Sequence, residues 1–324
     1  MQTTEFAFRP ADLDAAEAWL ARAATAAYEW ETDATRRETG ASECETRIDA
    51  VRNGADDEAF CLALSALSRY APRGPLFATG GSAGAGAVGA ESALGGWNPE
   101  RWTALDAQRV RLIVARAQAN DATLPDAMEE AFRYADEGEL RAIYRALQLL
   151  PGPERFLWRA KEGCRTNMKS VFEANGCDTV YPVAHFDDIA WRQLCMKALF
   201  IEAPLWRIVG FDGRVDDELA RMALDLADER RAAGRTVNPE LWMCLGATAS
   251  ERAVASIEDE IQRSTHEPSR KGAILALGRM GAEERLKEIE RDGGTVFGPV
   301  AQWALLGRFD QTAYASISPG EVPA

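Results

Sequence analysis

Residues 163–214 of the chain read GCRTNMKSVFEANGCDTVYPVAHFDDIAWRQLCMKALFIEAPLWRIVGFDGR. This central stretch combines three cysteines, one of the two histidines and seven aromatic rings. Its first half, through Ala184, lacks a sustained helical period and carries turn residues at Gly163, at 175–176 and at 181–182. A loop with so many large rings must pack on something. The first half is therefore predicted to be an irregular, buried, aromatic-rich loop.

The second half of the central stretch is predicted to be a helix. Apolar residues recur there at a spacing of three to four, which places them on one face; they are Phe186, Ile189, Ala190, Leu194, Ala198 and Ile201. Trp191, Cys195 and Leu199 form a second apolar stripe, so this helix should be covered on most sides. The side chains left for water are predicted to pair four residues apart, as Asp188–Arg192 and Gln193–Lys197.

The rest of the chain predicts an all-α fold. Amphipathic segments recur from about residue 12 to residue 306, and a strand signal is confined to the short run 179–181. Residues 270–281 resemble a HEAT-type repeat helix, because small residues there would let helices stack closely. Paired helices separated by short Gly or Pro turns are typical of helical repeat proteins. The sequence thus predicts an irregular α-solenoid of HEAT-like helical pairs.

Four parts of the chain are expected: N-terminal helices over 1–76, a Gly/Ala-rich flexible loop over 77–96, a helical repeat region over 97–315 and a tail over 316–324. Residues 84–89 of the loop match G-x-G-x-x-G. That motif binds dinucleotides only after a buried strand and within a βαβ unit. Because Pro72, Gly74 and Pro75 precede it instead, a linker or surface loop is the preferred interpretation.

Composition excludes several classes of function. The formal net charge of −14 argues against nucleic-acid binding, which needs clustered lysine and arginine. No stretch is long and apolar enough to span a bilayer, and no signal peptide is evident, so a cytoplasmic location is expected. The cysteines form no CxxC motif and most lie in apolar helical context, which predicts reduced, packed thiols.

The central stretch resembles the EboA family. The residues that carry the resemblance are 163–167 (GCRTN), 171–174 (VFEA), 177–178 (CD), 181–182 (YP), 185–187 (HFD), 190–191 (AW), 197–200 (KALF), 204–205 (PL), 208–210 (IVG), Asp212, 233–237 (AGRTV) and 239–242 (PELW). The resemblance supplies no catalytic residues. It implies a cytoplasmic member of a gene cluster that handles or exports secondary metabolites. In such a cluster it would accompany a prenyltransferase-like membrane protein and several enzyme-like proteins.

Three groups in the central stretch could carry chemistry. His185, with Glu173, Asp187 and Asp188 nearby in sequence, could form a metal or acid/base cluster, although a helix-start histidine that caps backbone amides or meets a carboxylate is favoured. Cys164 could be a nucleophile whose pKa Lys161 and Arg165 would lower, but no base is evident.

Arg165 with Asn167 could bind a ligand carboxylate or phosphate, because guanidinium groups suit oxyanions. The favoured alternative is that both tie down the buried loop, together with Thr166, Glu173 and Asp178. Tyr181 and Trp191 could line an aromatic ligand cleft.

The sequence favours a non-enzymatic helical scaffold or adaptor that works with other proteins of its cluster. It also allows a small apolar or aromatic metabolite bound near the central stretch, with Arg165, Asn167, Glu173, Tyr181, His185, Asp187 and Trp191 as ligand-binding candidates. No cofactor, nucleic acid or membrane insertion is expected. Two alternatives use Arg165, Glu173, His185 and Asp187: a metal-assisted or acid/base enzyme, and a dedicated metabolite carrier.

Overall fold

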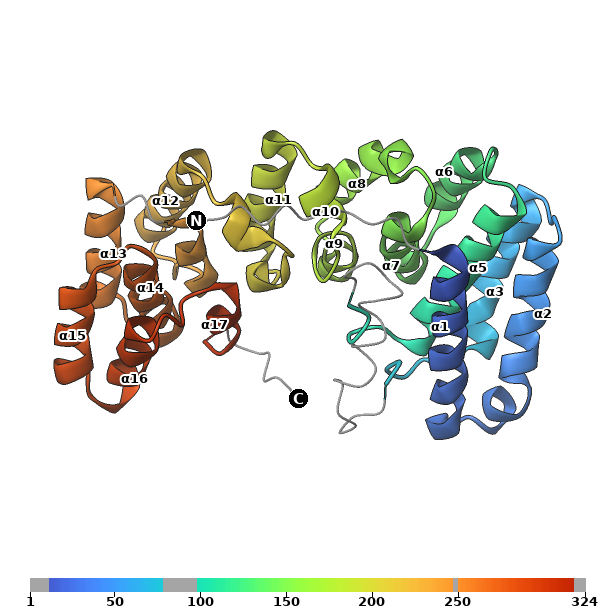
Figure 1. The fold of residues 1–324 in the computed structure, drawn as a ribbon, viewed down its shortest axis with the longest axis horizontal. Coiled ribbons are helices and arrows are strands. Elements are labelled where there is room, and N and C mark those ends of the chain that lie inside the picture. Colours follow the sequence, from blue (N-terminus) through green and yellow to red (C-terminus); the bar gives the residue numbers. More distant parts are fainter. Residues whose placement is uncertain (1–11, 78–97, 247–249, 318–324) are drawn as a thin grey trace. The chain divides into compact units, whose positions relative to one another are not determined.

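The structure is a computed structural model that describes residues 12–77, 98–246 and 250–317. The described chain divides into two compact units, an N-terminal unit that ends at Asp187 and a C-terminal unit that begins at Asp188. Within these ranges every regular element is a helix, and an isolated antiparallel bridge joins Pro75 to Thr103 (Figure 1). The all-α prediction is confirmed. The Gly/Ala-rich loop was predicted over 77–96. Except for Phe77, it lies outside the described residues.

The N-terminal unit contains α1 (Leu13–Ala26), η1 (Ala27–Trp30), the π-helical turn η2 (Arg36–Gly40), α2 (Ala41–Arg52), α3 (Asp57–Tyr70), α5 (Ala104–Ala119), α6 (Leu124–Tyr134), α7 (Glu137–Ala146), η3 (Leu147–Leu149), η4 (Pro153–Phe156), α8 (Leu157–Gly163), α9 (Lys169–Gly176) and α10 (Tyr181–His185). Side-chain oxygens cap several of these helices, and α5 and α7 begin with capping boxes, Thr103–Asp106 and Asp136–Glu139. Helix α2 was not predicted from the sequence.

Helix α5 is the centre of the N-terminal unit. It packs against α1, α2, α3 and α7, while α7 packs in turn against α9. Most of its residues are buried on all sides, including the charged side chains of Asp106, Arg109, Arg111 and Arg116. Each has ionic partners: Arg141 and Arg145 for Asp106, Glu139 for Arg109, Glu17 and Glu45 for Arg111, and Asp57 for Arg116. Buried charges are tolerated only when paired in this way.

The C-terminal unit contains α11 (Asp188–Ile201), η5 (Leu205–Arg207), η6 (Phe211–Arg214), α12 (Asp217–Ala232), η7 (Pro239–Cys244), α13 (Glu251–Arg263), α14 (Glu267–Arg279), α15 (Glu283–Asp292), α16 (Gly294–Leu305) and α17 (Gln311–Ala315). The sequence predicts a last helix over 299–306, but α16 begins earlier, at Gly294, and contains Pro299. It was predicted to be the last helix, which is wrong, because the short α17 follows it.

Helix α14 is the centre of the C-terminal unit and packs against η7, α13, α15 and α16. Small residues bring its neighbours close, as the sequence predicted. A Cβ atom on Gly272 would lie 2.2 Å from the carbonyl oxygen of Pro239, and one on Gly278 would lie 3.0 Å from the Cβ of Ala304. At Gly272 a larger side chain would require a backbone shift, and at Gly278 the Phe309 ring, 2.7 Å from the added Cβ, would have to move.

Asp212 fastens the end of the described chain to the rest of the C-terminal unit. Its carboxylate accepts hydrogen bonds from Arg279 Nη2 at 2.7 Å and from the backbone amide of Gln311 at 2.8 Å. The Gln311 side chain donates to the carbonyl oxygens of Trp206 and Ile208. Helix α17 is therefore held by charge and backbone hydrogen bonds, and not by apolar contact alone.

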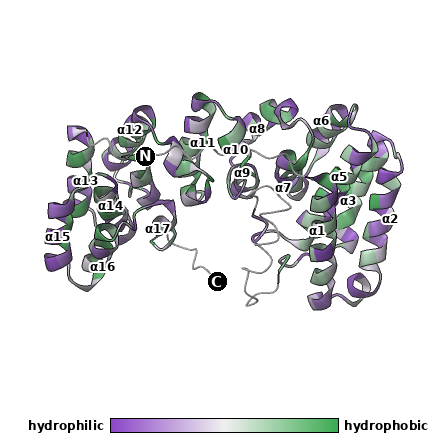
Figure 2. Cartoon of the chain, in the orientation of Figure 1, coloured by the Kyte–Doolittle hydropathy of each residue, from purple (hydrophilic) through white to green (hydrophobic). Residues whose placement is uncertain are grey.

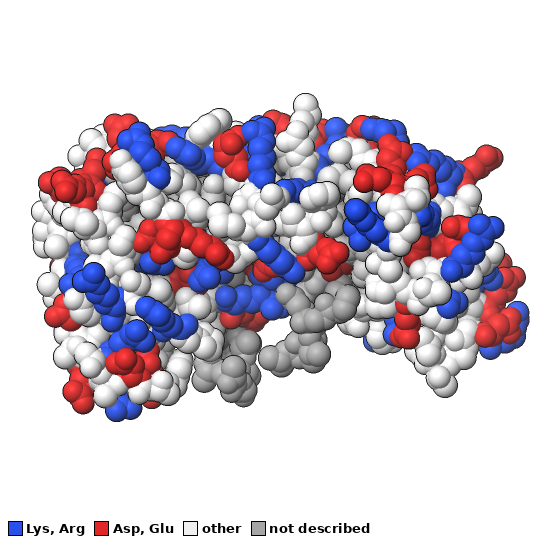
Figure 3. All heavy atoms as spheres, turned by 180° about the vertical axis from the view of Figure 1, so that it is seen from behind, with Lys and Arg blue, Asp and Glu red and all other residues white. Residues whose placement is uncertain are grey.

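Hydrophobic and hydrophilic residues alternate along most of the helices, as expected for amphipathic elements (Figure 2). Acidic and basic side chains are interspersed over the described part of the face seen in Figure 3. Many of them pair, for example Arg231 with Glu260 at 2.9 Å. Among the residues described, no helix is both long and apolar enough to cross a bilayer.

Candidate functional site

The first half of the central stretch is helical, and the predicted irregular loop is wrong. Residues 163–187 include the last residue of α8, all of α9 and all of α10, which are joined by irregular segments at 164–168 and 177–180. The residues that suggested a loop mark helix ends: Gly176 ends α9, and Pro182 lies in the first turn of α10. Proline is compatible with a first turn because the amide that it lacks has no partner there. The turn residues of this stretch therefore delimit short helices and not one continuous loop.

Two buried amide side chains support the remaining backbone of this region. Gln148 Oε1 accepts hydrogen bonds from Thr179 Oγ1 at 2.7 Å and from the Val180 amide at 3.2 Å. Asn175 Nδ2 donates to the Ala160 carbonyl oxygen at 2.8 Å and to Cys164 Sγ at 3.2 Å. The sequence favoured other residues for this supporting role, Arg165 and Asn167 among them. It missed Gln148 and Asn175, because an amide inside a predicted helix or turn gives no sign of its burial.

Tyr181 and His185 are the two candidates that the structure brings together. Both lie on α10, and their ring centroids are 4.7 Å apart. Tyr181 is buried and its hydroxyl donates to the Pro153 carbonyl oxygen at 2.5 Å. Burial raises the pKa of Tyr181 above its ordinary value. Burial lowers the pKa of His185, against the weaker opposing effect of Glu154, so the neutral imidazole is favoured at neutral pH.

Cys164 is a buried thiol at the end of α8. Its Sγ donates to the Ala160 carbonyl oxygen at 3.3 Å. Burial raises the pKa of Cys164 to about 12, although Asn175 and Arg165 act in the opposite direction. A thiol with this pKa is almost entirely protonated at neutral pH and is a poor nucleophile. All six cysteines are free thiols, and Cys61 alone among them is not fully buried.

Arg165 and Asn167 lie between α8 and α9, and both are exposed. Arg165 forms an ion pair with Glu162, three residues before it. Its side chain is 68% exposed, so it does not tie down buried backbone. The favoured structural interpretation of Arg165 is therefore wrong, and its guanidinium faces water.

Each of the two acidic candidates has a lysine partner. Glu173 is half-buried on α9, with Lys169 Nζ 3.9 Å from its carboxylate. Asp187 is exposed and accepts from Lys161 Nζ at 2.6 Å, which links the end of the N-terminal unit back to α8. Within the described residues, no group of three His, Cys, Asp or Glu side chains is arranged to hold a metal ion.

Trp191, the remaining candidate, lies in the C-terminal unit on α11. It is 1% exposed, and the Arg214 guanidinium lies over its ring at 4.6 Å from the centroid. Aromatic rings and guanidinium groups attract each other in this geometry. The expected burial of Trp191 is confirmed, as is that of Tyr181.

Helix α11 differs from its prediction in two ways. Ile189 and Phe200, which were expected to be covered, are 67% and 66% exposed. The predicted Asp188–Arg192 pair is wrong, because each residue has a partner beyond the helix. Arg192 Nη2 lies 2.6 Å from Asp216 Oδ2, and Asp188 Oδ1 accepts from Arg214 at 3.0 Å.

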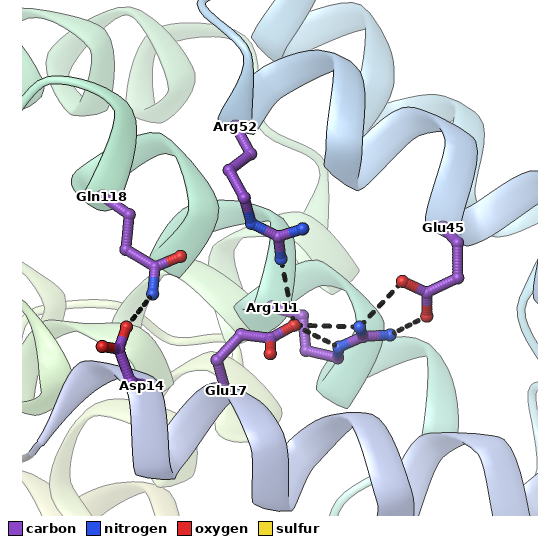
Figure 4. Close-up of a pocket in the computed structure, with 6 residues that line it drawn as sticks. All are labelled: Asp14, Glu17, Glu45, Arg52, Arg111 and Gln118. Atoms are coloured by element: carbon purple, nitrogen blue, oxygen red, sulfur yellow. Dashed lines mark hydrogen bonds and ion pairs between the residues drawn. The ribbon is translucent and has the colours of Figure 1, made fainter.

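A polar hollow in the N-terminal unit was not predicted from the sequence. It lies among α1, α2 and α5, has a volume of about 650 Å³ and is lined by Asp14, Glu17, Glu45, Arg52, Arg111 and Gln118 (Figure 4). The signal that could have found it is the run RVRLIVAR over 109–116, where arginines interrupt an otherwise apolar helix. Buried arginines require acidic partners, but their positions in the sequence could not be read from spacing.

The family model described as metabolite traffic protein EboA matches residues 26–246, which is more than half of the chain. The match includes α2 to α10 of the N-terminal unit and continues through η7 of the C-terminal unit. No curated protein and no solved structure matches the chain significantly.

Proposed function

The chain belongs to the EboA family, and from this premise we propose that it serves metabolite traffic as a non-enzymatic helical scaffold or adaptor. The proposal rests on the contacts that the reactive groups of the central stretch make in the structure. The Tyr181 hydroxyl is bound to Pro153, the Asp187 carboxylate to Lys161, and the Cys164 thiol is buried and protonated. These groups hold helices in place, which is a structural role.

The order of helix packing supports a scaffold built as an irregular α-solenoid of HEAT-like pairs. In the N-terminal unit α5, α7 and α9 pack in succession, while α6 packs on α3 and α7, and α8 packs on α9. In the C-terminal unit η7, α14 and α16 pack in succession, with α13 and α15 beside them. Such ladders of neighbouring helices are the arrangement that repeat proteins use to present extended binding surfaces.

Exposed large apolar side chains offer contact points for partner proteins. Trp158 on α8 is 60% exposed in the N-terminal unit, and Phe200 on α11 is similarly exposed in the C-terminal unit. Aromatic side chains are enriched at protein interfaces. The partners proposed are the prenyltransferase-like membrane protein and the enzyme-like proteins of the same gene cluster, with the chain itself in the cytoplasm.

A metabolite bound beside the central stretch is a second part of the proposal. Arg165 and Asn167 are exposed and could meet an oxyanion, whereas Tyr181 and His185 could serve only through the limited edges that they expose. Trp191 belongs to the C-terminal unit and is buried, so it is not part of this proposed site. Glu173 and Asp187 would contribute acceptors at the same stretch. Among these residues, Arg165 best fits ligand binding, because its side chain is exposed and its guanidinium group suits an oxyanion.

The test is affinity capture of the full-length chain from its native host, followed by mass spectrometry of proteins and of small molecules. A scaffold retains proteins of its own gene cluster in reproducible ratios, and Trp158→Ala or Phe200→Ala reduces that retention. Extracted metabolites are then incubated with the pure protein. Turnover that follows the protein through purification and is lost in His185→Ala would overturn the non-enzymatic proposal.

A further inference from the structure

A smaller hollow lies in the C-terminal unit, where α16 ends and α17 begins. Its volume is about 400 Å³, which is in the range of small-molecule sites. The side chains that line it include Trp303, Arg308, Asp310, Thr312 and Ser316. All of them follow residue 246, where the match to the family model ends, so the hollow is a feature of this chain outside the matched segment.

The end of α16 places Arg308 beside Trp303. Gly307 has a φ of 79°, in the left-handed region that glycine adopts where a helix ends. The Arg308 amide donates to the Trp303 carbonyl oxygen at 2.9 Å, and the Gly307 amide donates to that of Ala304 at 3.0 Å. Bonds of this kind turn the chain sharply at a helix end. One wall of the hollow is therefore fixed by backbone hydrogen bonds.

Helix α17 supplies another wall, and contacts on its inner face fix its position. The Gln311 amide is bound to Asp212, and the buried Tyr314 hydroxyl donates to the Gly272 carbonyl oxygen at 3.1 Å. Thr312 and Ser316, four residues apart, are both exposed. Their spacing places their hydroxyl groups on one side of the helical turn, where they line the hollow.

The lining offers hydrogen-bond donors that the described chain does not use. Among the described residues, no carboxylate or carbonyl group binds the Arg308 guanidinium, and none binds the Trp303 indole N–H or the Ser316 hydroxyl. An arginine without an acidic partner is notable in a chain with 51 acidic and 37 basic residues. The free donors favour a ligand that accepts hydrogen bonds.

The acid in the lining already has a structural role. Asp310 Oδ1 accepts from the Thr312 amide at 3.0 Å, from the Thr312 hydroxyl at 2.7 Å and from the Ala313 amide at 3.1 Å, and so caps α17. Its charge would repel a phosphate dianion more strongly than a carboxylate, which carries one negative charge. A carboxylate also matches the fork of a guanidinium group such as that of Arg308.

We propose that this hollow binds a small aromatic carboxylate. Its carboxylate accepts hydrogen bonds from Arg308 and Ser316, and its ring packs against Trp303, because aromatic rings attract each other in offset or edge contacts. The site uses no residue of the central stretch and does not depend on the scaffold proposal.

Calorimetric titration of the full-length protein tests the proposal with 2-naphthoate as the probe, at constant ionic strength. Saturable binding at one site is expected, with at least tenfold weaker binding of the neutral 2-naphthamide. Arg308→Gln is expected to weaken binding of the carboxylate about tenfold, because a charged donor is removed. Trp303→Leu should weaken it about fivefold, because the aromatic contact is lost.

Arg235→Gln is the matched control. Arg235 is an exposed arginine of the same unit outside the hollow, so its substitution removes the same charge and should leave the affinity unchanged. Arg165→Ala tests whether the probe binds at the central stretch instead, and should also have no effect. Thermal melting of each variant confirms that it is folded.

Four results would each overturn the proposal: absence of saturable binding, equal binding of the amide, an affinity that Arg308→Gln leaves unchanged, or an equal loss in Arg235→Gln. A loss in Arg165→Ala with none in Arg308→Gln would move carboxylate binding to the central stretch. The failure of this site can therefore be told apart from the failure of the metabolite site proposed there.

Discussion

The Tyr181 hydroxyl donates a hydrogen bond of 2.5 Å to the carbonyl oxygen of Pro153, and this bond ties α10 to the η4 turn. Both residues are buried, so water cannot replace either partner. The same tyrosine ring lies against His185. Tyr181 thus anchors α10, the helix that carries both Tyr181 and His185.

Replacing Tyr181 by phenylalanine should destabilise the protein without unfolding it. The change leaves the Pro153 carbonyl without its partner, which costs about 1–3 kcal/mol for a buried group. Arg165→Ala, which removes an exposed ion pair, should cost less than about 1 kcal/mol. Urea denaturation of both variants measures the difference. Equal losses would show that the Tyr181 hydroxyl has no special structural role.

Stability should fall in acid because of Asp106. Burial on its own raises the pKa of Asp106, but Arg145, Arg141 and the Thr103 amide outweigh it and hold the pKa below its ordinary value. A depressed folded-state pKa means stability that is present above the unfolded value, near pH 4, and lost as the pH falls through the folded value. Denaturation midpoints between about pH 7 and about pH 3 measure the slope.

The control for the acid prediction is Asp106→Asn. The amide keeps the shape but leaves two guanidinium groups without their anion, so it should cost about 3 kcal/mol or more at neutral pH. Its stability should then depend less on pH than that of the parent between pH 4 and 3. A variant with the parent's acid slope would show that other carboxylates are responsible.

Cys164 should resist alkylation in the native protein. The thiol is buried and its pKa is raised to about 12, so little thiolate exists at pH 8. Burial raises the pKa of Cys61 to about 11, with smaller contributions from neighbouring acids, and this cysteine is only half-buried. Iodoacetamide labelling read peptide by peptide should therefore modify Cys61 first. Faster labelling of Cys164 would restore it as a candidate nucleophile.

Gly272→Ala should be strongly destabilising because α14 and η7 approach each other closely at this position. The added Cβ would lie 2.2 Å from the Pro239 carbonyl oxygen, and overpacking of this kind costs about 1–3 kcal/mol. Gly213→Ala is the matched control in the same unit, since nothing lies within 4 Å of its Cβ position. Melting temperatures compare the two. A larger loss in Gly213→Ala would contradict the packing described for α14.

Long amphipathic helices were predictable from the sequence, and short or polar ones were not. The sequence predicts helices over 216–233 and 268–278, and α12 and α14 begin and end within one residue of these bounds, because their periodicity spans three or more turns. Helices α9 and α10 have eight and five residues, too few for a period to be seen. Helix α2 was missed because its buried residues are few: Cys44, Ile48 and Val51.

The ionic interior could not be predicted, because its partners are far apart in the sequence. Arg111 and Glu17 are separated by 94 residues, and Asp106 and Arg141 by 35. Local spacing favoured pairs within one helix, such as Asp188–Arg192, whereas the fold supplies partners from other elements. The hollow beside Arg111 follows from the same long-range pairing and was invisible for the same reason.

The exposed apolar residues of α11 should matter for partner binding and not for stability. Ile189 and Phe200 lie eleven residues apart on this helix, which places them on one face at 3.6 residues per turn. Replacing both by serine removes apolar surface that water already contacts, so the melting temperature should change little. Capture of proteins from the same gene cluster, quantified by mass spectrometry, should fall by about tenfold if this face is part of an interface.

Leu306→Ser is the matched control for that experiment. Leu306 follows α16, is 67% exposed and offers the same loss of exposed apolar surface elsewhere in the C-terminal unit. Its capture profile should equal that of the parent protein. Unchanged capture by the α11 double variant would show that this face is not part of an interface. An equal fall in Leu306→Ser would show that the effect follows from general surface hydrophobicity. Either result would remove α11 from the proposed docking surface.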